Sequence, residues 1–451
     1  MNPEQERVKE RIATELGRGR RRSNGLTLDA LDDDGLQAQH SPLMSPLIWD
    51  LAHIGNYEEQ WLLRAAGGRE ALRPDIDGLY DAFENPRNER IRLPLLDPAQ
   101  THEYNERVRR EVLDVLDRVD LGAAVPTPGG AVDGTGRSLL DHGFVFHMVI
   151  QHEHMHDETM LATHQLRRGA PVLLEEVDPI TLLSPPATDE AYVPPGTFTL
   201  GTDDDPWAFD NEKPAQEVYL DGYWIDTRPV TNAAYTEFVE DGGYHTQRWW
   251  TPQGWRWRTE REILAPAFWT QEGQGWSRLR FGRREMIPPQ EPVQHVSFHE
   301  AQAYARWAGK RLPSEAEWEK AARFDPGTGL SHPYPWGAEE PTFDHANLGQ
   351  RKLGPSVAGS HPAGTSPLGV QQLIGDVWEW TSTTFHGYPG FTAFPYREYS
   401  EVFFDDGYKV LRGGSWATHP TAIRSTFRNW DHPIRRQIFS GFRCARDADR
   451  D

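Results

Sequence analysis

Three histidines alternate along one short stretch of the sequence, and their spacing is typical of a metal-binding helix. Residues 151–160 read QHEHMHDETM. On a helix, His152 and His156 are one turn apart and project from the same face, whereas His154 points roughly the other way. His152 and His156 are therefore a candidate pair of metal ligands, and a functional site needs at least one more.

The same residues also match the H-E-x-x-H signature of zinc hydrolases. In that signature the two histidines hold zinc and the glutamate, here Glu153, is the general base. Asp157, Glu158 and His164 are available downstream as further ligands. The pattern is short, and histidine-rich helices also produce it by chance. From these residues alone, a zinc hydrolase, another metal enzyme and a polar helix face all remain open.

His53 is the best candidate for a third ligand. It lies in WDLAHIG, where the surrounding apolar residues predict a helix packed in the core. A lone histidine in such a setting is most simply a hydrogen-bonded core residue. If a partner helix carries the His152/His156 pair, metal binding becomes the favoured interpretation.

The elements that must position these histidines are helices within residues 1–170. Four segments repeat apolar residues at three- and four-residue spacing, and Asp97 is the expected N-cap of the third. The basic cluster from Arg18 to Arg22 is interpreted as the end of a solvated helix. Four amphipathic helices predict an up-and-down bundle, whose core can hold a metal between facing helices.

The rest of the sequence has a different composition. Residues 171–192 are acidic and contain prolines, so we interpret them as a linker. Residues 193–451 combine short strand-like runs with many glycines and tryptophans. Helices are expected only over 232–240 and over 298–323, the second broken near a proline. This pattern predicts an α+β domain dominated by turns.

The composition excludes several classes of function. The 451 residues exceed the size at which single cores split, so a multidomain chain is expected. A net charge of -21 argues against nucleic-acid partners, because binding them needs excess Lys and Arg. The N-terminus is charged, no apolar run is long enough to span a bilayer, and Cys444 is the only cysteine. We expect a cytoplasmic monomer without membrane partners.

The second half of the sequence resembles the formylglycine-generating-enzyme-like domain, a variant C-type-lectin fold. The matching segments are TRPVTNAAYTEFV, KRLPSEAEWEKAAR, YPWG, GDVWEWT, LRGGSW and GFRCA, in that order. The first half resembles the DinB-like metal-binding four-helix bundles. Together with HEHMHDETM and FRNWDHPIRRQIFSGFR, this pairing resembles the sulfoxide synthases of ergothioneine biosynthesis. The formylglycine generator itself binds copper through a cysteine pair, which a chain with one cysteine lacks.

The resemblance implies a specific metal and a specific reaction. The metal is non-haem Fe(II), held by His53, His152 and His156. The reaction joins the sulfur of γ-glutamylcysteine to C2 of the imidazole of hercynine, with O2 as oxidant. Three histidine ligands leave open positions for the reactants. In this reading Glu153 has no catalytic role, and the match to the zinc signature is accidental.

The resemblance also assigns the residues that bind substrates. Arg87 and Arg90 match the arginines that clamp the carboxylates of the thiol substrate, and a forked guanidinium suits that task. Asp431 matches the residue that takes the substrate ammonium. Asn429 and Trp430 match positions near hercynine, where an indole face suits a quaternary ammonium.

The proton donor of the family is a tyrosine. Tyr396 aligns best with it, and Tyr399 is the alternative. A phenol can deliver a proton without carrying charge into a dry site. Met155 departs from the family, which has a glutamine there, so the substrate imidazole lacks that hydrogen-bond donor.

Other functions remain open at this point. Related synthases use another donor, such as free cysteine or a selenosugar. A zinc hydrolase is the second class of function. A non-catalytic carbohydrate or protein binder is the third, because lectin-like folds often serve that purpose.

Overall fold

The chain forms two compact units in the computed structural model, which describes residues 3–122, 137–174, 188–273 and 275–448. Unit 1 comprises Met1–Leu174 and two short segments from later in the sequence, Asp205–Trp207 and Thr392–Tyr396. Unit 2 comprises the remainder. The sequence predicted one division near residues 171–192 and did not anticipate that later segments belong to the helical unit.

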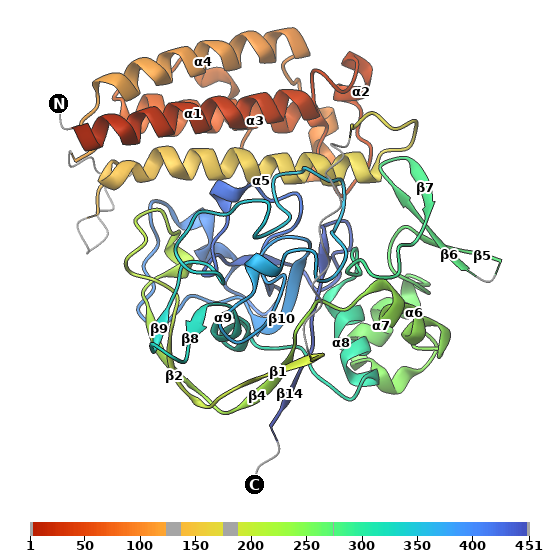
Figure 1. Ribbon diagram of the computed structural model, residues 1–451. Helices are drawn as coiled ribbons and strands as arrows, with labels where there is room; N and C mark the ends of the chain where they lie inside the picture. Colours follow the sequence, from red (N-terminus) through yellow and green to blue (C-terminus); the bar gives the residue numbers. More distant parts are fainter. Residues whose placement is uncertain (1–2, 123–136, 175–187, 274, 449–451) are drawn as a thin grey trace. The chain divides into compact units, whose positions relative to one another are not determined.

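Unit 1 is built on four long helices (Figure 1). Helix α5 packs against α1 and α3, and α4 packs against α3 and α1. The prediction of an all-helical first domain is confirmed. The helices of this unit are α1 (Pro3–Leu26), α2 (Asp33–Gln37), α3 (Leu47–Glu58), α4 (Pro98–Arg118) and α5 (Phe144–Leu166).

Two local features of unit 1 are the capped start of α4 and the π-helix that follows α3. Asp97 caps α4 by accepting a hydrogen bond from the backbone N–H of Gln100, whose side chain accepts one from the N–H of Asp97. Helix α3 runs directly into a π-helix, η1 (Glu59–Ala66). Such widened turns are rare and frequently occur at functional sites.

The basic cluster of α1 is only partly solvated, whereas the sequence predicted that it ends a solvated helix: Arg18 and Arg21 are exposed, but Arg20 is buried. Helix α1 continues to Leu26, and Arg20 is only 5% exposed. The Arg20 guanidinium donates to the carboxylates of Glu58 and Glu153, at 2.8 Å in each case. These partners lie 38 and 133 residues away along the chain, so the local sequence could not reveal the pairing.

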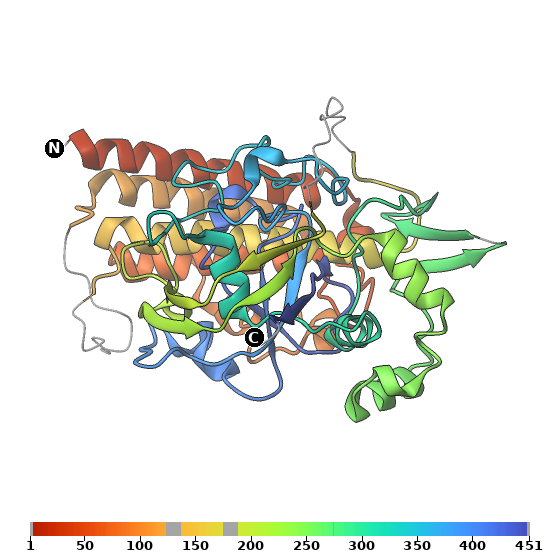
Figure 2. The ribbon, with the colours of Figure 1, turned by 60° about the horizontal axis from the view of Figure 1, so that its bottom comes forward.

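Unit 2 is an assembly of small sheets (Figures 1 and 2). Its last strand pairs with β4, so the beginning and the end of the unit lie side by side. The three larger sheets have the orders β1 (Glu190–Val193)–β4 (Tyr223–Asp226)–β14 (Ala445–Asp447), β12 (Asn429–Asp431)–β11 (Lys409–Arg412)–β10 (Trp378–Thr384)–β13 (Ser440–Gly441), and β5 (Trp269–Glu272)–β6 (Gly275–Arg280)–β7 (Arg283–Met286). Two-stranded sheets are formed by β2 (Gly196–Leu200) with β3 (Gln216–Leu220) and by β8 (Phe324–Asp325) with β9 (Leu330–Ser331).

The helices of unit 2 are short. The predicted helices are confirmed as α6 (Asn232–Glu240), α8 (Phe298–Trp307) and α9 (Glu315–Arg323). Helix α7 (Pro252–Glu260) was not predicted, although Thr251 caps it and Pro252 begins it.

Buried ion pairs hold α9 to the central sheet. Arg428 donates to Glu315 at 2.9 Å, and Arg412 pairs with Glu319. All four residues lie in or beside the segments that carry the family resemblance. These segments of unit 2 therefore encode the packing of this fold.

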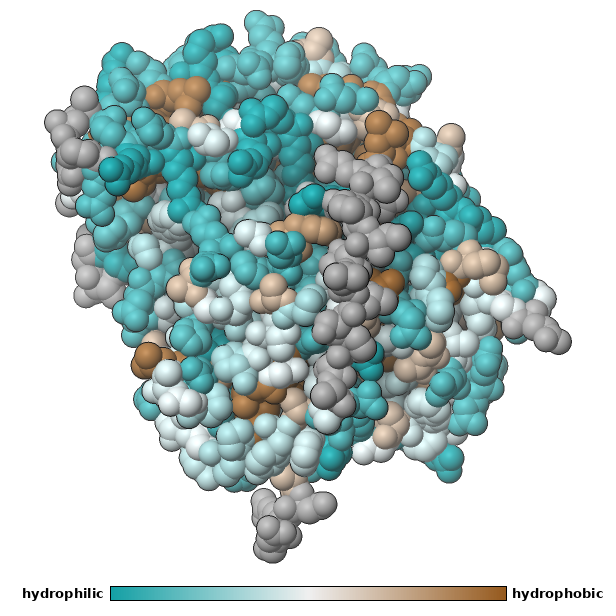
Figure 3. Space-filling model, viewed as in Figure 1, coloured by the Kyte–Doolittle hydropathy of each residue, from teal (hydrophilic) through white to brown (hydrophobic). Residues whose placement is uncertain are grey.

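The surface is predominantly hydrophilic on the face shown in Figure 3, where hydrophobic residues form small, separate groups. Among the described residues, no helix is both long enough and apolar enough to cross a membrane.

Candidate metal centre

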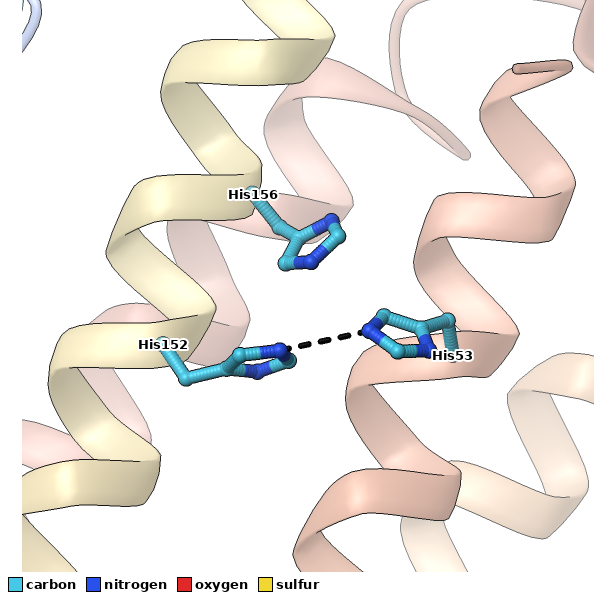
Figure 4. Close-up of side chains that lie close together, drawn as sticks. All are labelled: His53, His152 and His156. Carbon is cyan, nitrogen blue, oxygen red and sulfur yellow. Dashed lines mark hydrogen bonds between the residues drawn. The ribbon is translucent and has the colours of Figure 1, made fainter. Parts of the chain in front are cut away.

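Three imidazoles converge between α3 and α5 (Figure 4). His152 and His156 project from the same face of α5, and His53 faces them from α3. The potential ligand atoms of the three side chains lie within 4.8 Å of one another. The Nε2 atoms of His53 and His152 are 3.2 Å apart. The structure thus brings together the three histidines that the sequence analysis selected.

The backbone of unit 1 fixes the orientation of His53. Its Nδ1 lies 2.7 Å from the carbonyl oxygen of Tyr80. A carbonyl only accepts hydrogen bonds, so Nδ1 carries the proton and Nε2 presents its lone pair to the other histidines. The ring also stacks on Trp49, with centroids 4.7 Å apart.

A carboxylate performs the same task for His156. Its Nδ1 lies 3.0 Å from Oδ1 of Asp50, which is buried on α3. A hydrogen bond from Nδ1 to the carboxylate leaves Nε2 of His156 free to coordinate a metal and increases its basicity. Histidine ligands in proteins are commonly supported by such carbonyl and carboxylate partners.

The electrostatics favour the neutral form of two of the imidazoles, His53 and His152. Burial, and then repulsion from His156, lowers the pKa of both His53 and His152 well below the usual histidine value. Nδ1 of His152 is buried and has no hydrogen-bond partner among the described residues. Neutral imidazoles with available nitrogens are suitable ligands for a divalent transition metal. The residues present therefore fit a metal ion.

The opposite face of α5 carries Glu153 and His154, whose side chains are hydrogen-bonded to other side chains. Glu153 accepts hydrogen bonds from Arg20 at 2.8 Å and Arg109 at 3.3 Å. Burial opposes its ionisation, but these two guanidinium groups lower the pKa of Glu153 to about 2. Nδ1 of His154 lies 3.2 Å from the carboxylate of Asp157. With Glu153 held by two arginines, it is not available as the general base that a zinc hydrolase requires.

A tyrosine from a later part of the sequence belongs to the same unit. The segment Thr392–Tyr396 is part of unit 1, and Oη of Tyr396 lies 2.9 Å from Oη of Tyr57. The Tyr57 ring in turn stacks on the His152 ring, with centroids 3.7 Å apart. The alternative, Tyr399, belongs to unit 2 and stacks on Phe209. The geometry associates Tyr396 with the histidines.

Comparisons with known proteins identify the family. A DinB superfamily model matches residues 15–160, and a sulfatase-modifying factor enzyme 1-like domain model matches residues 181–448. The chain is 48% identical over 442 residues to the hercynine oxygenase of Mycobacterium tuberculosis, covering 97% of this chain and 99% of that protein. The hercynine oxygenase of Mycolicibacterium smegmatis is also 48% identical, with 98% and 100% covered. The chain belongs to the hercynine oxygenase family.

Membership of the hercynine oxygenase family confirms the resemblance and the two-part fold class inferred from the sequence. It also makes the chain an enzyme of the oxygenase class and excludes a purely structural or carbohydrate-binding role. The formylglycine-generating enzyme of Mus musculus is 31% identical over 312 residues, which are 62% of this chain and 79% of the mouse protein. That similarity concerns the fold of unit 2.

The two arginines expected to bind substrate differ in their surroundings. Arg90 is buried and donates to the carbonyls of Asn85 and Ala82 and to the hydroxyl of Ser45. Its guanidinium lies 3.4 Å from the ring centroid of Trp49, the residue that stacks on His53, and burial lowers the pKa of Arg90 to about 10. Arg90 therefore braces the wall behind an imidazole of the site.

Arg87 is half-buried and has looser contacts. It begins a short 3-10 helix, η3 (Arg87–Arg92), and its Nη1 lies 3.4 Å from the carbonyl oxygen of Leu43. The sulfur of Met44 is 4.0 Å from the same nitrogen. Compared with Arg90, this guanidinium keeps more of its donors for another acceptor.

The remaining predicted substrate residues form strand β12 of unit 2. Trp430 stacks on Phe385, with centroids 4.2 Å apart. Asp431 pairs with Arg435 at 3.3 Å, and the side-chain oxygen of Asn429 accepts from the backbone N–H of Trp430. The three residues are thus neighbours on one strand, in a different unit from Arg87 and Arg90.

The sequence analysis did not select Asp50 or Tyr57, which support the histidines. Both share a helix with His53, at spacings of three and four residues, and therefore lie on the same face. That spacing was a usable signal. The carbonyl of Tyr80 had no such signal, because any residue offers a carbonyl.

Proposed function

We propose that this chain is an Fe(II)-dependent sulfoxide synthase that joins γ-glutamylcysteine to C2 of the hercynine imidazole with O2. One thiol, one imidazole C–H and one O2 yield one sulfoxide-bridged product and one water, so atoms and electrons balance. The single observation that carries the proposal is the convergence of His53, His152 and His156 in a chain with 48% identity to hercynine oxygenases.

The residues of the chain divide the task. Bound Fe(II) would supply the oxygen chemistry, and the three imidazoles would leave other positions on it open. Asp50 and the Tyr80 carbonyl hold two of the rings in the tautomer that can coordinate. Tyr396 holds a proton on its phenol oxygen, which it would donate during the reaction.

Substrate binding is proposed for groups in both units. Arg87 would grip a carboxylate of the thiol substrate, and Arg90 would support the wall beside it. Asp431 would take the substrate ammonium, while Trp430 and Asn429 would contact hercynine. Since Met155 cannot donate a hydrogen bond, water or another side chain would contact the substrate imidazole.

We predict that Arg87→Ala raises the KM for γ-glutamylcysteine about ten- to a hundredfold, since a charge-assisted hydrogen bond contributes about 1.5–3 kcal/mol. The KM for hercynine should change little. Arg90→Ala should in addition weaken iron binding, because it removes the group packed on Trp49. Steady-state kinetics with each substrate varied separately would measure this. An equal loss for both substrates in Arg87→Ala would contradict the assignment.

The proposed function is tested by anaerobic reconstitution with Fe(II), addition of hercynine and γ-glutamylcysteine, and exposure to air. Mass analysis should detect the mixed sulfoxide. Parallel reactions with free cysteine and with a selenosugar separate the alternatives within the family. If product forms only with free cysteine or with a selenosugar, the assignment of γ-glutamylcysteine as the donor is wrong. If the zinc form of the protein is a hydrolase, the assignment of the reaction as an oxygenation is wrong.

We also propose that the protein acts as a cytoplasmic monomer. Its single cysteine, Cys444, is buried, and burial raises the pKa of the thiol well above its usual value. A buried neutral thiol is unreactive and forms no bond between chains.

A further inference from the structure

Tyr57 is the residue that connects the histidine cluster to Tyr396. It lies on α3, one turn after His53, where the helix is about to widen into the π-helix η1. Its ring is nearly parallel to that of His152, at an interplanar angle of 15° and a centroid distance of 3.7 Å. Its hydroxyl lies 2.9 Å from that of Tyr396. One side chain thus contacts a candidate ligand with its face and the candidate proton donor with its edge.

The neighbouring aromatic residue completes the setting of Tyr396. The Trp61 ring lies 5.1 Å from the Tyr396 ring and 6.0 Å from the Tyr57 ring, measured between centroids. Trp61 is a residue of the π-helix, and it is buried. The two phenols and the indole therefore pack together, which limits the positions that the Tyr396 hydroxyl can take.

The hydrogen bond between the phenols has a defined direction when Tyr396 acts as a proton donor. A phenol has one proton and can also accept hydrogen bonds. If Tyr396 directs its proton to the reacting oxygen, its own oxygen accepts from the hydroxyl of Tyr57. That hydrogen bond becomes charge-assisted once Tyr396 has given up its proton, and charge-assisted bonds are roughly twice as strong as neutral ones.

We infer that Tyr57 is a positioning residue for the reaction: its hydroxyl orients Tyr396 and stabilises it after proton donation, while its ring fixes His152. The inference rests on the proposed function, because it assigns Tyr396 the role of proton donor. It adds a second phenol to that role. Tyr57 touches neither substrate in this account and acts through Tyr396 and His152.

The two contacts of Tyr57 can be separated by substitution. Tyr57→Phe keeps the ring on His152 and removes only the hydroxyl, so iron stoichiometry should be unchanged. The ratio of sulfoxide to γ-glutamylcysteine sulfinic acid should fall about tenfold, because one strengthened hydrogen bond is lost. Tyr57→Leu removes the ring as well, and it should also weaken Fe(II) binding. Tyr244→Phe is the matched control, since its hydroxyl donates to Glu300 within unit 2, and it should keep the wild-type product ratio.

The decisive experiment compares product ratios of wild type, Tyr57→Phe, Tyr396→Phe and the double variant by NMR under air. If Tyr57 acts through Tyr396, the double variant has the same ratio as Tyr396→Phe alone. A further additive fall in the double variant, an unchanged ratio in Tyr57→Phe, or loss of iron from Tyr57→Phe would each overturn the inference. Wild type that forms no carbon–sulfur product would instead overturn the proposed function, so the two failures are distinguishable.

Discussion

The two faces of helix α5 both carry polar residues, but the residues on one face can bind a metal and those on the other are hydrogen-bonded to neighbouring helices. On one face, His152 and His156 meet His53 and present nitrogens that protein groups leave available. On the other face, Glu153 and Asp157 are enclosed by hydrogen-bond donors from α1 and α4. One sequence of alternating polar residues therefore serves metal binding on one side and helix packing on the other.

The difference lies in the partners. A buried carboxylate surrounded by guanidinium groups is satisfied electrostatically and has no capacity for further chemistry. The imidazoles of His53 and His156 are oriented by a carbonyl and a carboxylate, and their Nε2 atoms can coordinate a cation. The zinc-hydrolase signature spans both faces, and it is the buried arginines, not the histidines, that exclude the hydrolase.

The largest effect is expected from a substitution on the packed face of α5, the face that carries Glu153 and Asp157. Glu153→Gln removes one carboxylate from a buried network in which Arg20 and Arg109 also share Glu58. The uncompensated positive charge should lower the free energy of unfolding by about 3 kcal/mol. Urea denaturation of the metal-free protein would measure this. Iron stoichiometry should remain that of wild type. Loss of iron from Glu153→Gln would contradict the claim that only the opposite face of α5 binds the metal.

A smaller effect is expected behind the metal-binding face. In Asp50→Asn the amide oxygen can still accept from Nδ1 of His156, but the negative charge is lost. Iron affinity should fall about tenfold, at the lower end of the range for such supporting partners. Competition with a chelator of known affinity measures the change. An unchanged affinity would mean that Asp50 does not orient His156.

The smallest effect is expected from Ser23→Ala on the packed face. The Ser23 hydroxyl lies 2.7 Å from Asp157 and 3.0 Å from Glu153, and it can donate to one of them at a time. Its loss should lower the free energy of unfolding by about 1 kcal/mol. The product ratio should not change. A changed ratio in Ser23→Ala would show that the packed face takes part in the chemistry.

Much of the helical unit could be predicted from local patterns. The apolar periodicity located the helices, and Asp97 marked the start of α4. The i,i+4 spacing of His152 and His156 gave two candidate ligands directly. His53 required its apolar setting, and the metal and reaction required the family resemblance.

Features that depend on distant partners could not be predicted. Arg20 looked like part of a solvated helix end, because neither Glu58 nor Glu153 is near it in sequence. The contact between Tyr57 and Tyr396 joins residues 339 positions apart. Such pairings arise from the packing of whole elements, and a single sequence contains no periodicity that signals them.

Anaerobic titration with Fe(II) of wild type, His152→Ala and His154→Ala tests the central claim most directly. The two variants remove the same side chain from opposite faces of α5, two residues apart. Wild type and His154→Ala should each bind one Fe(II) per chain, whereas His152→Ala should lose tight binding. Retention of iron by His152→Ala, or its loss from His154→Ala alone, would contradict the assignment of the metal to the His53, His152 and His156 face.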